Sequence, residues 1–349
     1  MSSDSENAAP QGKSWTRRLV RVGAILTVIA ALICAGIAGY GWFEFNRAGP
    51  PAKGLASETV VLLDEGMGLN SIATRLEEAG VIRNRFVFRA GVLFSGNGKR
   101  LKAGEYSIPA RAPMDDVMRL LVEGKSILHK LTVPEGKTVA MIWRIVEEDP
   151  ILVGDMPAAM PPEGELLPET YLFMRGTSRA ELLERKHADH SDLLDQLWEG
   201  RKEGLPIASK DEAVTLASIV EKETGLAEER PRVAAVFVNR LRRGMKLQSD
   251  PTIIYGLTKG EPLGRGIRKS ELERRTPYNT YIIDGLPPTP IANPGRAALE
   301  AVLNPPDTEE LYFVADGTGG HVFAKTVSEH NRNVAAWRRI ERERRAEAN

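Results

Sequence analysis

A single cysteine and the absence of any excess charge already exclude several classes of protein. Cys34 is the only thiol among 349 residues, so the chain can form neither an internal disulfide framework nor a cysteine-based zinc site. Lysine and arginine together number 47, as do aspartate and glutamate, and the formal net charge is zero. Because domains that bind nucleic acid are strongly basic, we expect no nucleic-acid partner.

Histidine is also scarce, and its spacing does not suggest a metal site. None of the histidines stands in the H-E-x-x-H pattern that binds zinc on a helix. The five are His129, His187, His190, His321 and His330. We therefore expect neither a metal site nor a cofactor.

One long apolar run is present, over residues 22–43, and it carries no charged side chain. As a helix it would extend ~33 Å at ~1.5 Å per residue, enough to cross a hydrocarbon core of ~30 Å. Lysine and arginine cluster just before it, within residues 13–21, which favours a cytoplasmic N-terminus. We expect a cytoplasmic tail over 1–21, a single transmembrane helix over 22–43, and the rest of the chain outside the plasma (inner) membrane.

A cleaved signal peptide is the alternative for this apolar run. Small residues between positions 35 and 39 would permit cleavage. Signal peptides, however, usually have an apolar core of only ~7–15 residues, shorter than this run. If the helix is retained, Tyr40, Trp42 and Phe43 would form an aromatic belt at the outer membrane surface.

Composition and hydrophobic periodicity divide the remainder of the chain and predict the fold class α+β. Proline and glycine are frequent over 44–57, which indicates a linker. The segments after it are a first folded region over 58–128, a connecting segment over 129–161, a second folded region of mixed α and β elements over 162–337, and a charged helical tail over 338–349.

The first folded region alternates strand and helix patterns in the order β-α-α-β-α. Strand patterns cover 59–63 and 104–108. Helix patterns begin near Ser71, near Arg85 and at Met114. This order predicts a small module with two paired strands.

The segment from Ser209 to Gly225 predicts a helix with one unusual carboxylate. Ser209 and Glu212 form a capping-box pattern, and Gly225 would stop the helix. A helical wheel places Glu223 in the middle of the apolar stripe. The same wheel places Glu221 on the opposite face, where it would be a surface charge.

An apolar setting would change the chemistry of Glu223. Burial and the negative end of the helix dipole both raise the pKa of a carboxyl group. A protonated glutamate at neutral pH can act as a general acid toward a glycosidic oxygen. The alternative is a structural Glu223 that pairs with Arg230 or Arg232 at the helix end.

Two later segments have the composition of a sugar-binding cleft. A polar turn covers 247–252, and tyrosine alternates with polar residues over 278–281. Aromatic rings and amides suit the C–H faces and hydroxyl rims of sugars, although such turns are also common surface features.

Ordered motifs through the second region resemble the YceG-like, MltG-type endolytic murein transglycosylases. The motifs are ASIVEKET over 217–224, VNRL over 238–241 with Gly244 and Met245, LQSDPT over 247–252 with Tyr255 and Gly256, TPYNTY over 276–281, GLPP over 285–288 with Pro290 and Ile291, YFVADG over 312–317, and then Gly320, His321, Phe323, His330 and Asn331. The layout resembles this family from the membrane helix to about residue 337.

The resemblance implies roles for particular residues. Glu223 matches the catalytic glutamate, the second of the E-K-E-T motif. The substrate-binding positions would be Gln248, Asp250, Tyr278, Asn279 and Tyr281. The resemblance also implies that 162–337 is a YceG-like catalytic domain and that 58–128 is a LysM-like glycan-binding module.

The activity implied by the resemblance is that of an endolytic lytic transglycosylase, a carbon–oxygen lyase. It would cleave the MurNAc–GlcNAc β-1,4 bond within nascent peptidoglycan strands and leave 1,6-anhydroMurNAc ends, which would terminate strand elongation. A single glutamate would serve as acid and then as base, without a cofactor or metal. The implied partners are peptidoglycan strands, the inner membrane and the peptidoglycan synthases.

Two other functions remain compatible with the sequence. A membrane-anchored scaffold would bind peptidoglycan without needing Glu223. A muramidase-type hydrolase would need a second carboxylate, for which Asp250 and Glu221 are the candidates. Product mass separates the enzymes, because only hydrolysis adds water.

Overall fold

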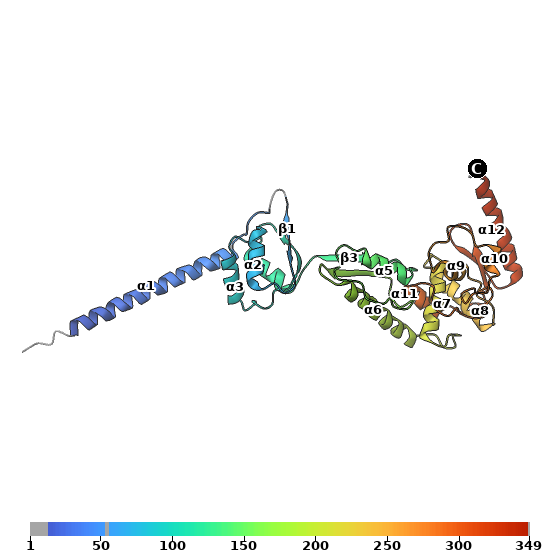
Figure 1. Ribbon diagram of the computed structural model, residues 1–349, viewed down its shortest axis with the longest axis horizontal. Coiled ribbons are helices and arrows are strands. Elements are labelled where there is room, and N and C mark those ends of the chain that lie inside the picture. Colours follow the sequence, from blue (N-terminus) through green and yellow to red (C-terminus); the bar gives the residue numbers. More distant parts are fainter. Residues whose placement is uncertain (1–12, 53–55, 348–349) are drawn as a thin grey trace, which may run out of the picture. The chain divides into compact units, whose positions relative to one another are not determined.

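The computed structural model describes residues 13–52 and 56–347 and has a mixed α+β architecture (Figure 1). Two compact units divide the chain. The first unit comprises Met1–Leu128 with Met174–Gly176, and the second comprises His129–Phe173 with Thr177–Asn349. The α+β class predicted from the sequence is confirmed.

Helix α1 (Lys13–Asn46) contains the apolar run. Its portion Arg18–Asn46 is long and apolar enough to cross a membrane or to serve as a signal sequence. Most of the predicted tail, residues 1–12, lies outside the described residues. The helix continues into the predicted linker 44–57, because the side chain of Phe45 is buried beside Phe88 in the core of the first unit.

The first unit has the predicted element order. The elements are β1 (Glu58–Leu63), α2 (Leu69–Glu78), α3 (Arg85–Phe94), β2 (Gly104–Pro109) and α4 (Met114–Glu123). Strands β1 and β2 are antiparallel, with Glu58 opposite Pro109 and Leu63 opposite Gly104. Alternate residues of β1, Val61 and Leu63, point into the core, as the period of a half-buried strand requires.

The second unit begins within the segment predicted as a connector over 129–161. That segment supplies most of β3 (Leu128–Thr132) and all of α5 (Val139–Glu147). Strand β3 pairs with β4 (Thr170–Met174), and α6 (Arg179–Glu199) follows. A separate apolar cluster, which includes Ile142, Trp143 and Phe173, fills this part of the unit.

The rest of the second unit is mainly helical. The elements are α7 (Lys210–Glu223), α8 (Arg230–Arg242), α9 (Asp250–Thr258), α10 (Lys269–Leu272), α11 (Arg296–Leu303), β5 (Tyr312–Ala315), β6 (His321–Ala324) and α12 (Val327–Glu347). Helix α7 packs against α8, α9 and α11. Its residues 213–221 are all buried, so α7 is the central helix of this core.

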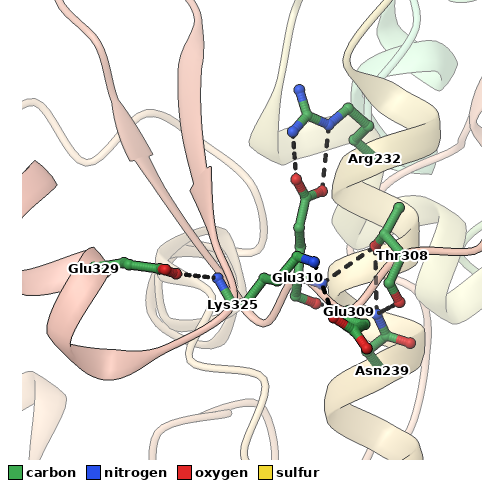
Figure 2. A network of polar contacts seen from close by, with 7 residues as sticks. All are labelled: Arg232, Asn239, Thr308, Glu309, Glu310, Lys325 and Glu329. Atoms are coloured by element: carbon green, nitrogen blue, oxygen red, sulfur yellow. Dashed lines mark hydrogen bonds and ion pairs between the residues drawn. The ribbon is translucent and has the colours of Figure 1, made fainter.

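A polar network fixes the loop before β5 on α8 (Figure 2). The guanidinium of Arg232 binds both carboxylate oxygens of Glu310. The amide of Asn239 donates to two carbonyl oxygens of the same loop, at 2.8 and 3.1 Å. Lys325, just after β6, pairs with Glu309 at 2.9 Å. These bonds hold the β5–β6 hairpin in place beside α8.

Candidate active site

Glu223 is the last residue of α7, and a hydroxyl group binds its carboxyl. Ser249 Oγ donates a hydrogen bond to Glu223 Oε1 at 2.5 Å. The side chain is partly exposed, while protein groups surround the carboxyl. Burial raises the pKa of Glu223 to about 7, and the negative charge of Asp250 acts in the same direction. The Ser249 hydrogen bond and the charges of His321 and Arg240 oppose this rise only in part.

The local sequence ends α7 at this carboxylate. The helix starts where predicted, with the Ser209 hydroxyl accepting from the Glu212 N–H at 3.2 Å. It ends because Thr224 adopts an extended backbone with φ −137°. Gly225, the predicted stop, follows directly after this cap residue. Glu223 therefore lies at the C-terminal end of α7, beside the turn that contains Ser249.

A buried set of hydroxyl groups fixes the position of Ser249. Its N–H donates to Thr280 Oγ1 at 2.9 Å, and its carbonyl accepts from Thr252 Oγ1 at 2.7 Å. The preceding residue, Gln248, takes the left-handed backbone conformation at φ +52° and donates its N–H to the Thr280 carbonyl at 3.1 Å. This conformation is unfavourable for a residue with a side chain, so the hydrogen bonds stabilise the turn. The Gln248 side chain is exposed beside it.

Asp250 and Tyr281, two of the predicted site residues, form a pair next to Glu223. Tyr281 donates its hydroxyl to Asp250 Oδ1 at 2.7 Å. Asp250 is exposed at the first position of α9. Burial raises the pKa of the Tyr281 hydroxyl, as do the hydrogen bond to Asp250 and the negative charges of Asp250 and Glu223. The polar turn and the tyrosine-rich segment thus meet at Glu223.

Asn279 is buried and occupied within its own loop. Its Nδ2 lies within hydrogen-bond distance of three backbone carbonyls, at residues 271, 272 and 274, and its Oδ1 accepts from the Tyr281 N–H at 3.0 Å. These bonds set the path of the loop that carries Tyr281. Asn279 therefore affects the site indirectly, by fixing the loop that carries Tyr281.

Tyr278 contributes an aromatic surface. Its ring meets that of Tyr255 edge-on at 5.1 Å between centroids, and its hydroxyl is 2.8 Å from Thr289 Oγ1. The ammonium group of Lys259 lies 4.9 Å from the ring centroid. The side chain is only partly buried.

The prediction that Glu221 is a surface charge is wrong. Its side chain is 3% exposed, and it accepts from Arg230 Nη2 at 2.9 Å and from the Gly295 N–H at 3.0 Å. Arg230 also binds Glu135, at 2.8 Å. The helical wheel assumes one solvent-facing side, whereas α7 is buried on every side along residues 213–221. Arg230 thus pairs with Glu221 and not with Glu223.

Glu163 joins separate elements of the second unit through its carboxylate. Its Oε1 accepts from the Val139 N–H at 2.7 Å and from Asn293 Nδ2 at 3.2 Å. Its Oε2 accepts from the Tyr255 hydroxyl at 3.2 Å. Burial raises the pKa of Glu163, although these hydrogen bonds oppose the rise. Both oxygens are occupied by protein donors, as are those of Glu221.

A histidine–glutamate pair lies close to the end of α7. His321 Nδ1 is 2.7 Å from Glu229 Oε2, and the His321 N–H donates to Glu229 Oε1 at 2.7 Å. Thr224, which follows Glu223, donates its hydroxyl to Glu229 Oε2 at 3.3 Å. Burial acts to raise the pKa of Glu229, but the hydrogen bonds from His321 outweigh it and lower the pKa.

Sequence reasoning missed Ser249 and Glu229 as site residues. Ser249 stands between Gln248 and Asp250 in a motif already singled out, so its position offered a signal. Glu229 offered none, because its partner His321 lies 92 positions further along the chain.

A cavity of about 590 Å³ lies elsewhere in the second unit, by β4 and α6. Tyr171, Arg185 and Asp189 are among its lining residues, and Glu223 is not. The assignment of a chemical role to Glu223 therefore depends on its hydrogen bond and its pKa, and not on this cavity. Within residues 13–52 and 56–347, no three histidine, cysteine, aspartate or glutamate side chains gather closely enough to hold a metal ion.

A family model and two curated proteins match this chain over most of its length. The model of the YceG-like family matches residues 61–336. The endolytic murein transglycosylase of Streptococcus pneumoniae serotype 2 (strain D39) is 29% identical over 360 residues, and the match covers 89% of this chain and 64% of that protein. The endolytic murein transglycosylase of Bacillus subtilis (strain 168) is 28% identical over 313 residues, covering 81% and 86%.

A solved structure also matches, that of a yceG-like protein from Listeria monocytogenes. Sequence identity is 31%, coverage is 79% of this chain and 98% of that one, and the TM-score is 0.46. The chain thus spans nearly all of the listerial protein but 64% of the streptococcal one.

Proposed function

This chain belongs to the YceG-like family, and on that premise we propose that it is a membrane-anchored lytic transglycosylase that cleaves peptidoglycan. Its relatives in Streptococcus and Bacillus carry the name endolytic murein transglycosylase. The observation that carries the proposal is the state of Glu223. Its carboxyl has a pKa of about 7 and accepts a hydrogen bond from Ser249, so it can both hold and release a proton near neutral pH.

In the first step of the proposed reaction, Glu223 acts as a general acid. It donates its proton to the glycosidic oxygen between N-acetylmuramic acid and N-acetylglucosamine. The bond from C1 of the muramic acid to that oxygen breaks, and the N-acetylglucosamine leaves with a free 4-hydroxyl. The 2-acetamido group of the substrate stabilises the oxocarbenium-like centre left at C1.

In the second step, the same residue acts as a base. The Glu223 carboxylate takes the proton from the 6-hydroxyl of the muramic acid while that oxygen bonds to C1. The 1,6-anhydro product forms, Glu223 is protonated again, and no water is consumed. The Ser249 hydrogen bond supports the carboxylate form that this step requires.

The other site residues would position the glycan strand. Gln248 and Asp250 are exposed on either side of Ser249, which contacts Glu223, while Tyr278 and Tyr281 offer partly buried rings. Asn279 would contribute by holding the Tyr281 loop in place. We assign sugar contacts to the first four residues, because polar groups and aromatic faces suit sugar rings.

The hydrolase alternative depends on Asp250. Glu221 is engaged by Arg230 and Gly295, so it is poorly placed to serve as a second carboxylate. Asp250 is near enough for its charge to raise the pKa of Glu223. A muramidase with Asp250 as the second carboxylate is therefore the second candidate function.

Fragment analysis tests the proposal. The full-length chain in detergent is incubated with purified peptidoglycan, beside Glu223→Gln and the exposed-site control Glu203→Gln. We expect internal fragments with 1,6-anhydro ends from the wild type and the control, and none from Glu223→Gln at an unchanged Tm. Undiminished cleavage by Glu223→Gln would refute the role of Glu223. If neither the wild type nor either variant cleaves peptidoglycan, the result would favour the non-catalytic scaffold.

The location of the chain is part of the same proposal. We propose that α1 is retained in the inner membrane, with its N-terminus in the cytoplasm and the residues that follow α1 outside. Burial of Phe45 in the first unit supports retention, because the C-terminal end of α1 belongs to a folded core. Near this membrane the enzyme would meet nascent strands and the synthases that make them, and its cuts would end strand elongation. The first unit would be a LysM-like module that contacts glycan.

A further inference from the structure

Helix α3 is apolar on both sides. Only its inward side packs in the core of the first unit, and its outward side is exposed. Phe88 and Val92 are buried and fix α3 in the core of the first unit. On the other side, Phe86, Leu93 and Phe94 are 61%, 60% and 95% exposed. Positions 86, 90 and 93 follow the spacing of a single helical stripe. A large exposed apolar stripe in a folded unit indicates a surface that contacts something.

Contacts with α1 place this stripe at the end of the uncharged run. Arg83, just before α3, donates to two carbonyl oxygens just after α1, at 3.0 and 3.1 Å. Further along α3, Gly91 lies so close to the ring of Phe45 that no side chain would fit between them. The two helices therefore run antiparallel. At ~1.5 Å per residue, Phe94 is about level with Trp42.

The segment around the stripe carries charge of one sign. Between Ala79 and Gly104 there is no aspartate or glutamate, and the cations are Arg83, Arg85, Arg89, Lys99, Arg100 and Lys102. Lys99 and Arg100 are exposed in the loop that follows the stripe. An apolar helix face flanked by cations is the pattern of a helix that lies in a membrane interface and contacts anionic lipid.

From this juxtaposition we propose that the α3 face docks the first unit on the outer surface of the membrane that α1 spans. Leu93 and Phe94 insert among the lipids, beside the exposed rings of Trp42 and Phe43. Lys99 and Arg100 contact the headgroups of anionic phospholipids. The inference rests on the proposed membrane anchor. Because α1 ends in the core of the first unit, docking fixes the tilt of both against the membrane, and so the height at which the unit meets glycan.

Thiol accessibility tests the docking in the full-length chain, reconstituted in nanodiscs of phosphatidylcholine with phosphatidylglycerol. The native Cys34 reports on α1. In a Cys34→Ser background, Ala90→Cys reports on the α3 stripe and Glu203→Cys on an exposed site of the second unit. Each thiol is reacted with a water-soluble maleimide. We expect protection of Cys34 and of Ala90→Cys, and fast reaction of Glu203→Cys.

Added substitutions identify the cause of the protection. Leu93→Ser with Phe94→Ser should abolish protection of Ala90→Cys, and removal of phosphatidylglycerol should weaken it. Val153→Ser, which removes an exposed apolar side chain of the second unit, should leave it unchanged. Reaction of Ala90→Cys as fast as Glu203→Cys, with Cys34 protected, would overturn the docking alone. Fast reaction of Cys34 would overturn the anchor, and the docking with it.

Discussion

At the residue scale, the carboxyl of Glu223 is held between influences that favour opposite protonation states. Burial and the charge of Asp250 favour the acid, whereas the Ser249 hydrogen bond favours the carboxylate. A residue that gives a proton in one step and takes one in the next needs both forms to be accessible. The opposition of burial and hydrogen bonding therefore suits one residue to both steps.

The pKa of about 7 predicts the pH dependence of cleavage. Only the protonated form of Glu223 in the free enzyme can start the reaction, and this form is lost as the pH rises through that value. We expect kcat/KM to be level below about pH 7 and to fall about tenfold per pH unit above it. Initial rates of cleavage across the pH range measure this. A fall centred near the ordinary value of 4.5 would contradict the shielding of the carboxyl.

Ser249→Ala tests the opposing influence. The hydrogen bond from Ser249 lowers the pKa of Glu223, so its loss should raise that pKa. We expect the fall in kcat/KM to move upward by about one pH unit. At the plateau, kcat should also decrease, because the second step needs the carboxylate. Ser191→Ala, at an exposed position of α6, is the matched control. A Ser249→Ala profile that coincides with the control would exclude the hydrogen bond as a determinant.

At the element scale, α7 shows what hydrophobic periodicity can predict. The start at Ser209 and the helix itself follow from the sequence, because a cap and an apolar run are local signals. The surroundings of each face are not local. Burial along 213–221 comes from packing by α8, α9 and α11, so the wheel could not distinguish a buried Glu221 from an exposed one.

The buried pair of Glu221 and Arg230 predicts a large effect on stability. Arg230→Met would leave Glu221, 3% exposed, without its cation. We expect a loss of about 3–5 kcal/mol in the free energy of unfolding of the second unit. Glu221→Leu added to Arg230→Met should restore much of it, because the buried charge is then gone. Urea unfolding of the wild type, Arg230→Met and the double variant measures these free energies. A loss of unfolding free energy that Glu221→Leu does not reduce would contradict this account.

At the scale of the whole molecule, the sequence predicted the order of the elements but not the contacts that build the site. Glu223 and Ser249 are 26 positions apart, Asp250 and Tyr281 are 31, and Glu229 and His321 are 92. Periodicity, caps and turns carry no information at such separations. The roles expected for Gln248, Asp250 and Tyr281 came from resemblance to a family, and the fold brings Asp250 and Tyr281 together beside Glu223.

The fate of water decides most directly between a lytic transglycosylase and its hydrolytic alternative. Peptidoglycan is digested by the wild type, Glu223→Gln and Asp250→Asn in heavy-oxygen water, and the new ends are weighed by mass spectrometry. We predict wild-type ends with no heavy oxygen and no added water, some residual cleavage of the same kind by Asp250→Asn, and none by Glu223→Gln. Heavy oxygen in the wild-type ends, with loss of all cleavage in Asp250→Asn, would show a hydrolase with two carboxylates and contradict the single-glutamate mechanism.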